Sequence, residues 1–239
     1  MTTSIAEKLE TLRRRIRQAE RAAGRPEGSV RLVAVSKTHP PAALIAAYRL
    51  GQREFGENYL QEALAKQDRL AHFDICWHFI GPLQSNKTRP IAARFAWVHG
   101  VDRLKIAERL SEQRPAGLPP LNVCLQLNVS SEASKSGVSP AELPALAAAV
   151  AELPRLRLRG LMAIPAPTAD TEAQRAAFRA VRRAFEGLAG HGLDTLSMGM
   201  SEDLEAAVSE GATLVRVGTA LFGSRPAGSP RSPGIPGPR

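Results

Sequence analysis

Short runs of strand-forming residues alternate with helix-like segments along most of this 239-residue chain, and this alternation constrains the fold more than any other feature. Strands that alternate with helices need crossover connections, which make the strands parallel. Eight such strands in about 200 residues fit a closed (β/α)8 TIM barrel better than an open sheet. The predicted strands span residues 31–36, 54–57, 77–80, 97–99, 123–128, 158–163, 195–198 and 214–217. The predicted helices between them span residues 42–50, 60–72, 86–93, 104–112, 141–152, 172–189 and 204–210.

The two ends of the chain differ from this pattern. Apolar residues recur every three or four positions from Ile5 to Ala19, which predicts an extra helix before the first strand. Residues 224–239 contain five Pro and three Gly with almost no apolar content, which is typical of a disordered tail. We therefore expect a single α/β barrel domain over residues 1–223, followed by a disordered tail over residues 224–239.

The formal net charge of +9 is concentrated at the ends of the chain. Residues 1–26 carry seven basic and three acidic side chains, and residues 224–239 carry three Arg and no acid. The body of the chain is nearly neutral, so no basic groove for nucleic acid is expected there. The basic run at residues 13–17 is expected to form the solvated face of the first helix. A nucleic-acid-associated role through the basic ends is a weaker alternative.

The sequence also indicates the cellular compartment of the protein and whether it binds a metal ion. No apolar run approaches the roughly 20 residues of a membrane span, and the N-terminus lacks the apolar stretch of a secretory signal. Cys76 and Cys124 form no CxxC pair and lie in apolar runs, which indicates buried free thiols in a reducing, cytoplasmic setting. The histidines show no metal-ligand spacing, so no metal is expected. His78 and His99 lie in adjacent predicted strands and are expected to meet inside the barrel as core residues.

Lys37 is the first candidate functional residue, because it follows the strand-forming run VRLVAVS directly. In a barrel of this kind, side chains at the carboxyl ends of the strands converge on one pocket. A lysine buried at such an end must be paired, neutralised or chemically used. The segments GENY (residues 56–59), GPLQSNK (81–87), SMGMSED (197–203) and RVGTALFG (216–223) follow other predicted strands and converge on the same mouth.

The last two of these segments predict a phosphate site. Loops after strands 7 and 8 often bind phosphate in this architecture. Ser201 stands at a predicted helix N-cap, and its hydroxyl and the free backbone N–H groups there could hold a phosphate oxygen. Gly218 and Thr219 offer close backbone approach and a second hydroxyl. Taken singly, Ser201 is better explained as a helix cap and Gly218 as a turn residue, but together, beside a buried lysine, they favour a phosphate site.

A lysine and a phosphate cradle in one mouth suggest two chemistries. Lys37 could form a Schiff base with a sugar-phosphate substrate, or with the aldehyde of pyridoxal 5'-phosphate (PLP). In both cases the amine must be neutral to attack, so burial is expected to depress the pKa of Lys37.

Six motifs together resemble the pyridoxal phosphate homeostasis protein family (YggS/PROSC): AVSK, GENYLQEA, WHFIGPLQSNK, LRGLMAI, LSMGMSEDLEAAV and VRVGTALFG. The resemblance runs from about residue 5 to residue 223. It implies the barrel of the alanine racemase N-terminal domain. It also implies PLP binding and control of the cellular supply of PLP (vitamin B6 homeostasis), without established catalytic turnover.

The resemblance also implies roles for individual residues. Lys37 is expected to be the Schiff-base lysine, and Arg216 to face the pyridine nitrogen of the cofactor. Ser201, Gly218 and Thr219 are expected to bind its phosphate. The residues expected to line the cofactor or pack on its ring are Asn58, Ile80 and Met200.

Physical arguments favour a binding protein over an enzyme. An arginine beside the ring nitrogen opposes its protonation and weakens the ring as an electron sink. An open mouth also suits release of a cofactor better than protected carbanion chemistry. We therefore expect a monomer that holds PLP and hands it to apo-enzymes, with no catalytic residues. The alternative is a slow PLP-dependent amino-acid racemase, which needs a second base that the sequence does not reveal.

Overall fold

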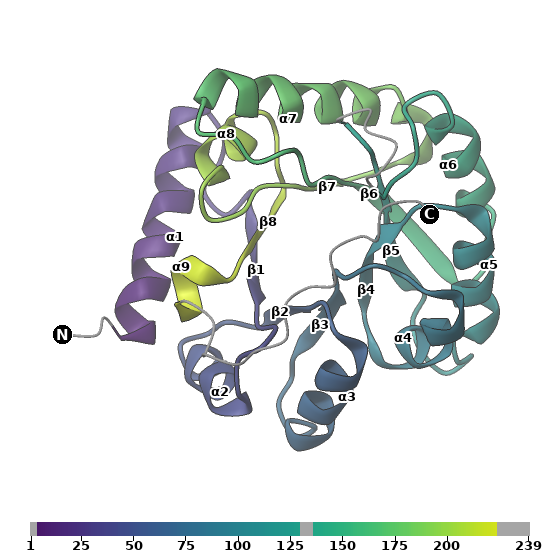
Figure 1. Ribbon diagram of the computed structural model, residues 1–239, viewed down its shortest axis with the longest axis horizontal. Coiled ribbons are helices and arrows are strands. Elements are labelled where there is room, and N and C mark those ends of the chain that lie inside the picture. The colour runs from purple at the N-terminus through teal and green to yellow at the C-terminus, as the bar shows by residue number, and fades with distance from the viewer. Residues whose placement is uncertain (1–3, 130–135, 224–239) are drawn as a thin grey trace, which may run out of the picture.

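Eight parallel strands close into a barrel in sequence order in the computed structural model, which describes residues 4–129 and 136–223 (Figure 1). The last strand pairs with the first, with Arg31 opposite Leu214. The strands are β1 (Arg31–Val35), β2 (Glu54–Glu57), β3 (Cys76–Phe79), β4 (Trp97–Val101), β5 (Leu121–Gln126), β6 (Leu156–Met162), β7 (Thr195–Ser197) and β8 (Leu214–Val217). The predicted closed barrel is confirmed. The predicted tail over residues 224–239 lies outside the described residues.

Helices surround the barrel (Figure 1). They are α1 (Ile5–Ala22), α2 (Pro41–Arg49), α3 (Leu60–Arg69), α4 (Thr88–Arg94), α5 (Leu104–Gln113), α6 (Leu143–Ala151), α7 (Thr171–Glu186), α8 (Leu204–Ser209) and α9 (Thr219–Phe222). Helix α4 begins later than predicted, because Ser85–Lys87 forms a separate 3-10 turn. None of the helices in the described ranges is long and apolar enough to cross a membrane.

The predicted N-terminal helix is present as α1, and it packs against α8 and α9 (Figure 1). The Ser4 hydroxyl accepts the Glu7 N–H, and the Glu7 carboxylate accepts the Ser4 N–H, so a capping box starts the helix. Leu9, Leu12 and Ile16 form its buried stripe. Each such side chain contributes about 1.5–3 kcal/mol when fully buried. The first helix of the chain is therefore fixed to the last two.

The two faces of the strands carry different chemistry. Phe55, Trp77 and Phe79 belong to the hydrophobic core that the strands share with the surrounding helices. The alternate residues of β3 and β4 point into the barrel, where the His78 ring stacks on Trp97 at a centroid distance of 5.5 Å. TIM barrels usually fill this space with branched aliphatic side chains. The polar interior found here is therefore a feature that needs a functional explanation.

Candidate functional site

The turn after β1 carries Lys37 and a strained neighbour. Ser36 donates its N–H to the Gly56 carbonyl at 2.9 Å, so the hydrogen bonding between β1 and β2 extends to Ser36. Lys37 is therefore the first residue after the carboxyl end of the strand. Lys37 is partly buried. Thr38 has a φ of 66°, a left-handed conformation that β-branched residues rarely adopt. Its N–H donates to Glu62 Oε1 at 2.6 Å. Backbone strain held in place by such contacts is typical of functional turns.

The ends of β2 and β3 form the neighbouring wall of the mouth. Asn58 follows β2 and is partly buried, and Ile80 follows β3 and is buried. The two segments approach so closely that a Cβ atom at Gly81 would lie 2.2 Å from the Asn58 carbonyl oxygen. A Cβ atom at Gly56 would lie 3.0 Å from Ile80 Cδ1. Both glycines therefore make room for the residues predicted to line a ligand.

Two buried oxygen atoms at this mouth have no hydrogen-bond partner among the described residues, namely Thr38 Oγ1 and Asn58 Oδ1. A buried polar atom without a partner costs about 1–3 kcal/mol. Thr38 and Asn58 follow neighbouring, paired strands, β1 and β2. The mouth therefore presents polar atoms that a bound polar molecule could satisfy.

A buried lysine other than Lys37 also lies near this end of the barrel. Lys66 on α3 donates to the Ser36 carbonyl at 2.7 Å, to Glu57 Oε1 at 2.7 Å and to Glu62 Oε1 at 2.5 Å. The Ser36 hydroxyl donates to the same Glu57 oxygen at 2.6 Å. Burial raises the pKa of Glu57, and the ammonium of Lys66 opposes that rise. This cluster supports the backbone on either side of Lys37 from outside the barrel.

Arg216 lies inside the barrel on β8 and is only 5% exposed. Its Nη1 donates to the Ser197 carbonyl at 2.6 Å and to the Ser197 hydroxyl at 2.8 Å, and its Nη2 donates to the Ala163 carbonyl at 3.0 Å. Burial lowers the pKa of Arg216 to about 10, which leaves it charged at neutral pH. No carboxylate in residues 4–129 and 136–223 forms an ion pair with it. Neutral oxygens alone hold this cation.

A chain of hydrogen bonds connects Arg216 to the opposite end of the barrel. The Ser197 hydroxyl lies 2.7 Å from His99 Nδ1, His99 Nε2 lies 2.9 Å from His78 Nδ1, and His78 Nε2 lies 3.5 Å from Cys76 Sγ. Burial lowers the pKa of His78 to about 3 and that of His99 well below its ordinary value. Both imidazoles are therefore neutral at physiological pH. The prediction that the two histidines meet inside the barrel is confirmed.

The prediction that Ser201 caps a helix is wrong. Helix α8 begins at Leu204, with Asp203 at its N-cap and Ser201 in the preceding turn. Asp203 Oδ1 accepts the Met200 N–H at 2.6 Å, which closes this turn and displaces the helix start. The Ser201 hydroxyl instead accepts the Ala220 N–H at 3.4 Å, at the start of α9. The loop after β7 thus contacts the segment that follows β8.

Gly218 and Thr219 lie next to this contact. Gly218 approaches β1 closely, since a Cβ atom there would lie 3.1 Å from the Val35 carbonyl oxygen. Thr219 is exposed at the first position of α9. From α1, Arg15 donates to the Ser201 carbonyl at 3.0 Å and to both Glu205 oxygens, at 2.7 and 2.9 Å. The two predicted phosphate-binding segments and the end of β1 are therefore adjacent.

The structure brings most of the predicted residues to one end of the barrel. Asn58 and Ile80 lie on the β2–β3 side of Lys37, and the loops after β7 and β8 lie on its other side. Arg216 stands two residues before Gly218 on β8 and so lies deeper in the barrel. Met200 is 37% exposed, in the loop after β7.

Sequence reasoning missed several residues that support these positions. The spacing of Glu62 and Lys66 on one helical face was a visible signal for part of the ion cluster. Arg15 lies in the basic run that was expected to be solvated, yet it contacts the loop after β7. The role of Ser197 depends on its contacts with His99 and Arg216 across the barrel, which no local pattern reveals.

Comparison with known proteins finds one family model over most of the chain and relatives that share one name. The family model for the alanine racemase N-terminal domain matches residues 8–226. A pyridoxal phosphate homeostasis protein of Pseudomonas aeruginosa is 66% identical over 230 residues, which cover 96% of this chain and 100% of the relative. A protein of the same name from Escherichia coli K12 is 54% identical over 229 residues, which cover 92% of this chain and 97% of the relative.

Solved structures resemble this chain over most of its length. PipY of Synechococcus elongatus, determined with PLP bound, superposes with a TM-score of 0.81 at 40% identity, covering 92% of this chain and 100% of PipY. Alanine racemase from Corynebacterium glutamicum superposes with a TM-score of 0.67 at 20% identity, covering 93% of this chain and 63% of the racemase. The second likeness supports the shared barrel fold alone.

Proposed function

The chain belongs to the alanine racemase N-terminal domain family and, within it, to the pyridoxal phosphate homeostasis proteins, and we therefore propose that it binds PLP at the mouth of the barrel. In this proposal the protein takes part in the homeostasis of PLP by buffering the cofactor and supplying it to apo-enzymes. The binding domain comprises residues 1–223, and the protein acts in the cytoplasm as a monomer.

The predicted residues fit this cofactor. When bound, PLP supplies an aldehyde that condenses with the amine of Lys37 to give a Schiff base. Ser201, Gly218 and Thr219 bind its phosphate, and the contact between Ala220 N–H and the Ser201 hydroxyl brings the two phosphate-binding segments within reach of one anion. Asn58, Ile80 and Met200 line the ring. The unsatisfied oxygens of Thr38 and Asn58 gain polar partners when the cofactor is present.

Arg216 is the observation that carries the proposal. It is a buried cation without a paired carboxylate in the described residues, and it lies two residues before the phosphate-binding Gly218 on the same strand. Its charge attracts an anionic ligand, and beside a pyridine nitrogen it opposes protonation of that nitrogen. An unprotonated ring withdraws electrons weakly, which favours storage of the cofactor over turnover. The competing function, a slow PLP-dependent racemase, needs a second base that the sequence does not reveal.

An absorbance titration tests the binding mode. Purified protein mixed with PLP is expected to turn yellow and, after borohydride reduction, to carry the cofactor covalently on the peptide containing Lys37. Lys37→Ala should abolish the covalent adduct. Lys87→Ala removes an exposed lysine of the GPLQSNK segment and is the matched control, which should bind as the parent does. A colourless parent protein, or an adduct on another lysine, contradicts the proposal.

A second measurement separates storage from catalysis. The loaded protein is incubated with L-alanine or L-serine, and the chirality of the amino acid is followed alongside a free-PLP control. We expect no racemisation above the free-cofactor rate, and transfer of PLP to an added apo-enzyme with recovery of that enzyme's activity. Racemisation well above the control supports the racemase instead.

A further inference from the structure

The N-terminal end of the barrel carries a second cluster of reactive side chains, at the opposite end from Lys37. Glu54 is the first residue of β2 and lies directly opposite Cys76, the first residue of β3. His78 follows on the same face of β3. A carboxylate oxygen of Glu54, Cys76 Sγ and a ring nitrogen of His78 all lie within 4.8 Å of one another. The strand register, rather than sequence spacing, brings these three groups together.

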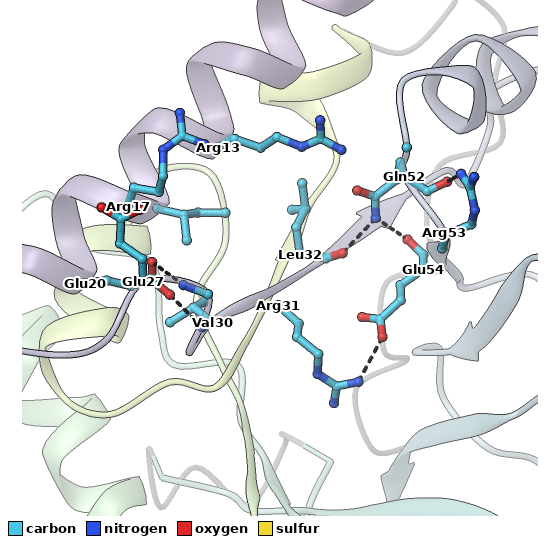
Figure 2. Close-up of a pocket in the computed structure, with 13 residues that line it drawn as sticks. Arg13, Arg17, Glu20, Glu27, Val30, Arg31, Leu32, Gln52, Arg53 and Glu54 are labelled. Atoms are coloured by element: carbon cyan, nitrogen blue, oxygen red, sulfur yellow. Dashed lines mark hydrogen bonds and ion pairs between the residues drawn. The ribbon is translucent and has the colours of Figure 1, made fainter.

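One carboxylate oxygen of Glu54 is available to a ligand. Its Oε1 accepts a hydrogen bond from Arg31 Nη1 at 2.8 Å, whereas its Oε2 is buried and has no hydrogen-bond partner among the described residues. The pair lines a groove of about 510 Å³ between α1 and the starts of β1 and β2, and Figure 2 shows Arg31 and Glu54 paired there. Arg31 thus orients the carboxylate at the groove.

We propose that Glu54, Cys76 and His78 form a binding site for a zinc-class divalent metal ion at the N-terminal end of the barrel. Thiolate, imidazole and carboxylate are the ligand types that Zn²⁺ prefers, and a solvent molecule completes four-coordination. In a tetrahedral zinc site a sulfur and a nitrogen ligand lie about 3.5 Å apart, from standard bond lengths. His78 Nε2 and Cys76 Sγ already lie 3.5 Å apart. The carboxylate oxygen lies within 4.8 Å of both atoms.

The protonation states are compatible with this coordination. His78 is neutral, so its ring nitrogen needs no deprotonation before it binds a metal ion. Burial raises the pKa of Cys76 to about 12, so the metal ion displaces the thiol proton into solvent as the thiolate–metal bond forms. The guanidinium of Arg31 repels a cation, but it also holds the non-coordinating oxygen of Glu54.

Metal binding fixes the direction of the hydrogen-bond chain inside the barrel. If His78 Nε2 binds the ion, His78 Nδ1 must carry the proton and donate to His99 Nε2, as metal-bound histidines commonly donate through their second nitrogen. His99 Nδ1 then donates to the Ser197 hydroxyl, which also accepts from Arg216. The opposite order, from Arg216 to Cys76, is open to the metal-free protein. The site is therefore linked to Arg216 through two side chains, those of His99 and Ser197.

Zinc binding to the full-length protein tests the proposal under reducing conditions, after treatment with a chelator. Isothermal titration with Zn²⁺ is expected to give one site per chain. X-ray absorption of the zinc-loaded protein should show one sulfur neighbour at about 2.3 Å with nitrogen and oxygen neighbours at about 2.0–2.2 Å. This readout does not depend on PLP, so its failure leaves the proposed function intact. A shell of nitrogen and oxygen alone overturns the proposal.

Matched variants locate the ion. Cys76→Ser should remove the sulfur neighbour, and Glu54→Gln should weaken zinc binding by about tenfold or more. Cys124→Ser, which alters the other buried thiol, and Glu27→Gln, which alters another carboxylate of the same groove, should leave the site unchanged. Zinc affinity that is equal in Cys76→Ser and the parent overturns the proposal, as does histidine nitrogen NMR that finds the proton of His78 on Nε2 in the zinc form.

Discussion

Lys66 and Arg216 are both cations buried near the carboxyl ends of the strands, yet their partners differ. Lys66 is 4% exposed and contacts two carboxylates, Glu57 and Glu62. Arg216 is 5% exposed and, within the described part of the chain, is bound by carbonyl and hydroxyl oxygens without an ion pair. The charge of Lys66 is cancelled locally, whereas that of Arg216 acts on whatever enters the barrel. The comparison indicates that Lys66 serves the structure and Arg216 serves a ligand.

The largest expected effect on stability comes from removing the paired cation, Lys66. Lys66→Met leaves Glu57 buried without its ion partner, and removal of one partner of a buried pair typically costs about 3–5 kcal/mol of unfolding free energy. Urea unfolding at neutral pH measures the loss. The double variant Lys66→Met/Glu57→Gln should recover much of it, because the uncompensated charge is gone. A loss below about 1 kcal/mol in the single variant means that Glu57 is not ionised.

Removal of the unpaired cation, Arg216, should lower the free energy of unfolding less than removal of Lys66 does, but it should weaken PLP binding more. Arg216→Met leaves the Ser197 hydroxyl and two carbonyls with fewer donors, at about 1–3 kcal/mol, but it also removes a buried charge without a counter-ion. We expect a smaller loss than for Lys66→Met, together with clearly weaker PLP binding in the absorbance titration. Arg216→Lys keeps the charge and is the control. Unchanged affinity in Arg216→Met means that its charge does not act on the cofactor.

A third cation, Arg15, sharpens the comparison because its ion pair faces solvent. The hydrogen bond from Arg15 lowers the pKa of Glu205 below its ordinary 4.5. Stability from this pair is therefore full above that value and is lost as pH falls through the lowered pKa. Arg15→Gln should cost at most about 1 kcal/mol at pH 7 and almost nothing in acid. Urea unfolding of parent and variant at both pH values gives the difference, with Arg14→Gln, which alters an exposed arginine of the same helix, as the control. If Arg15→Gln loses the same unfolding free energy at both pH values, the prediction is wrong.

The sequence predicted the elements better than the contacts between them. Alternating strand and helix patterns are local, so the barrel and the positions of Lys37, Gly218 and Thr219 at strand ends followed directly. Strand starts were less accurate. Strand β5 begins at Leu121, two residues before its predicted start, because pairing with Leu156 of β6 begins there.

Contacts that depend on register or on helix docking could not be predicted. Glu54, Cys76 and His78 meet only because Glu54 and Cys76 lie opposite each other in neighbouring strands. Lys66 reaches the Ser36 carbonyl only after α3 has docked on the barrel. Ser201 is predicted as a helix cap because Ser is a preferred N-cap residue. Asp203, two residues later, is preferred equally, and the single sequence does not decide between them.

The position of α1 has a consequence for biosynthesis. Arg15 contacts residues that follow it by 186 and 190 positions, so its partners are among the last of the described residues to leave the ribosome. The helix is translated first, but its docking surface does not yet exist. The nascent chain therefore keeps an amphipathic segment uncovered during most of its synthesis, when chaperones are best able to bind it. Docking of α1 therefore waits for α8 and α9, which lie on either side of the strand that closes the barrel.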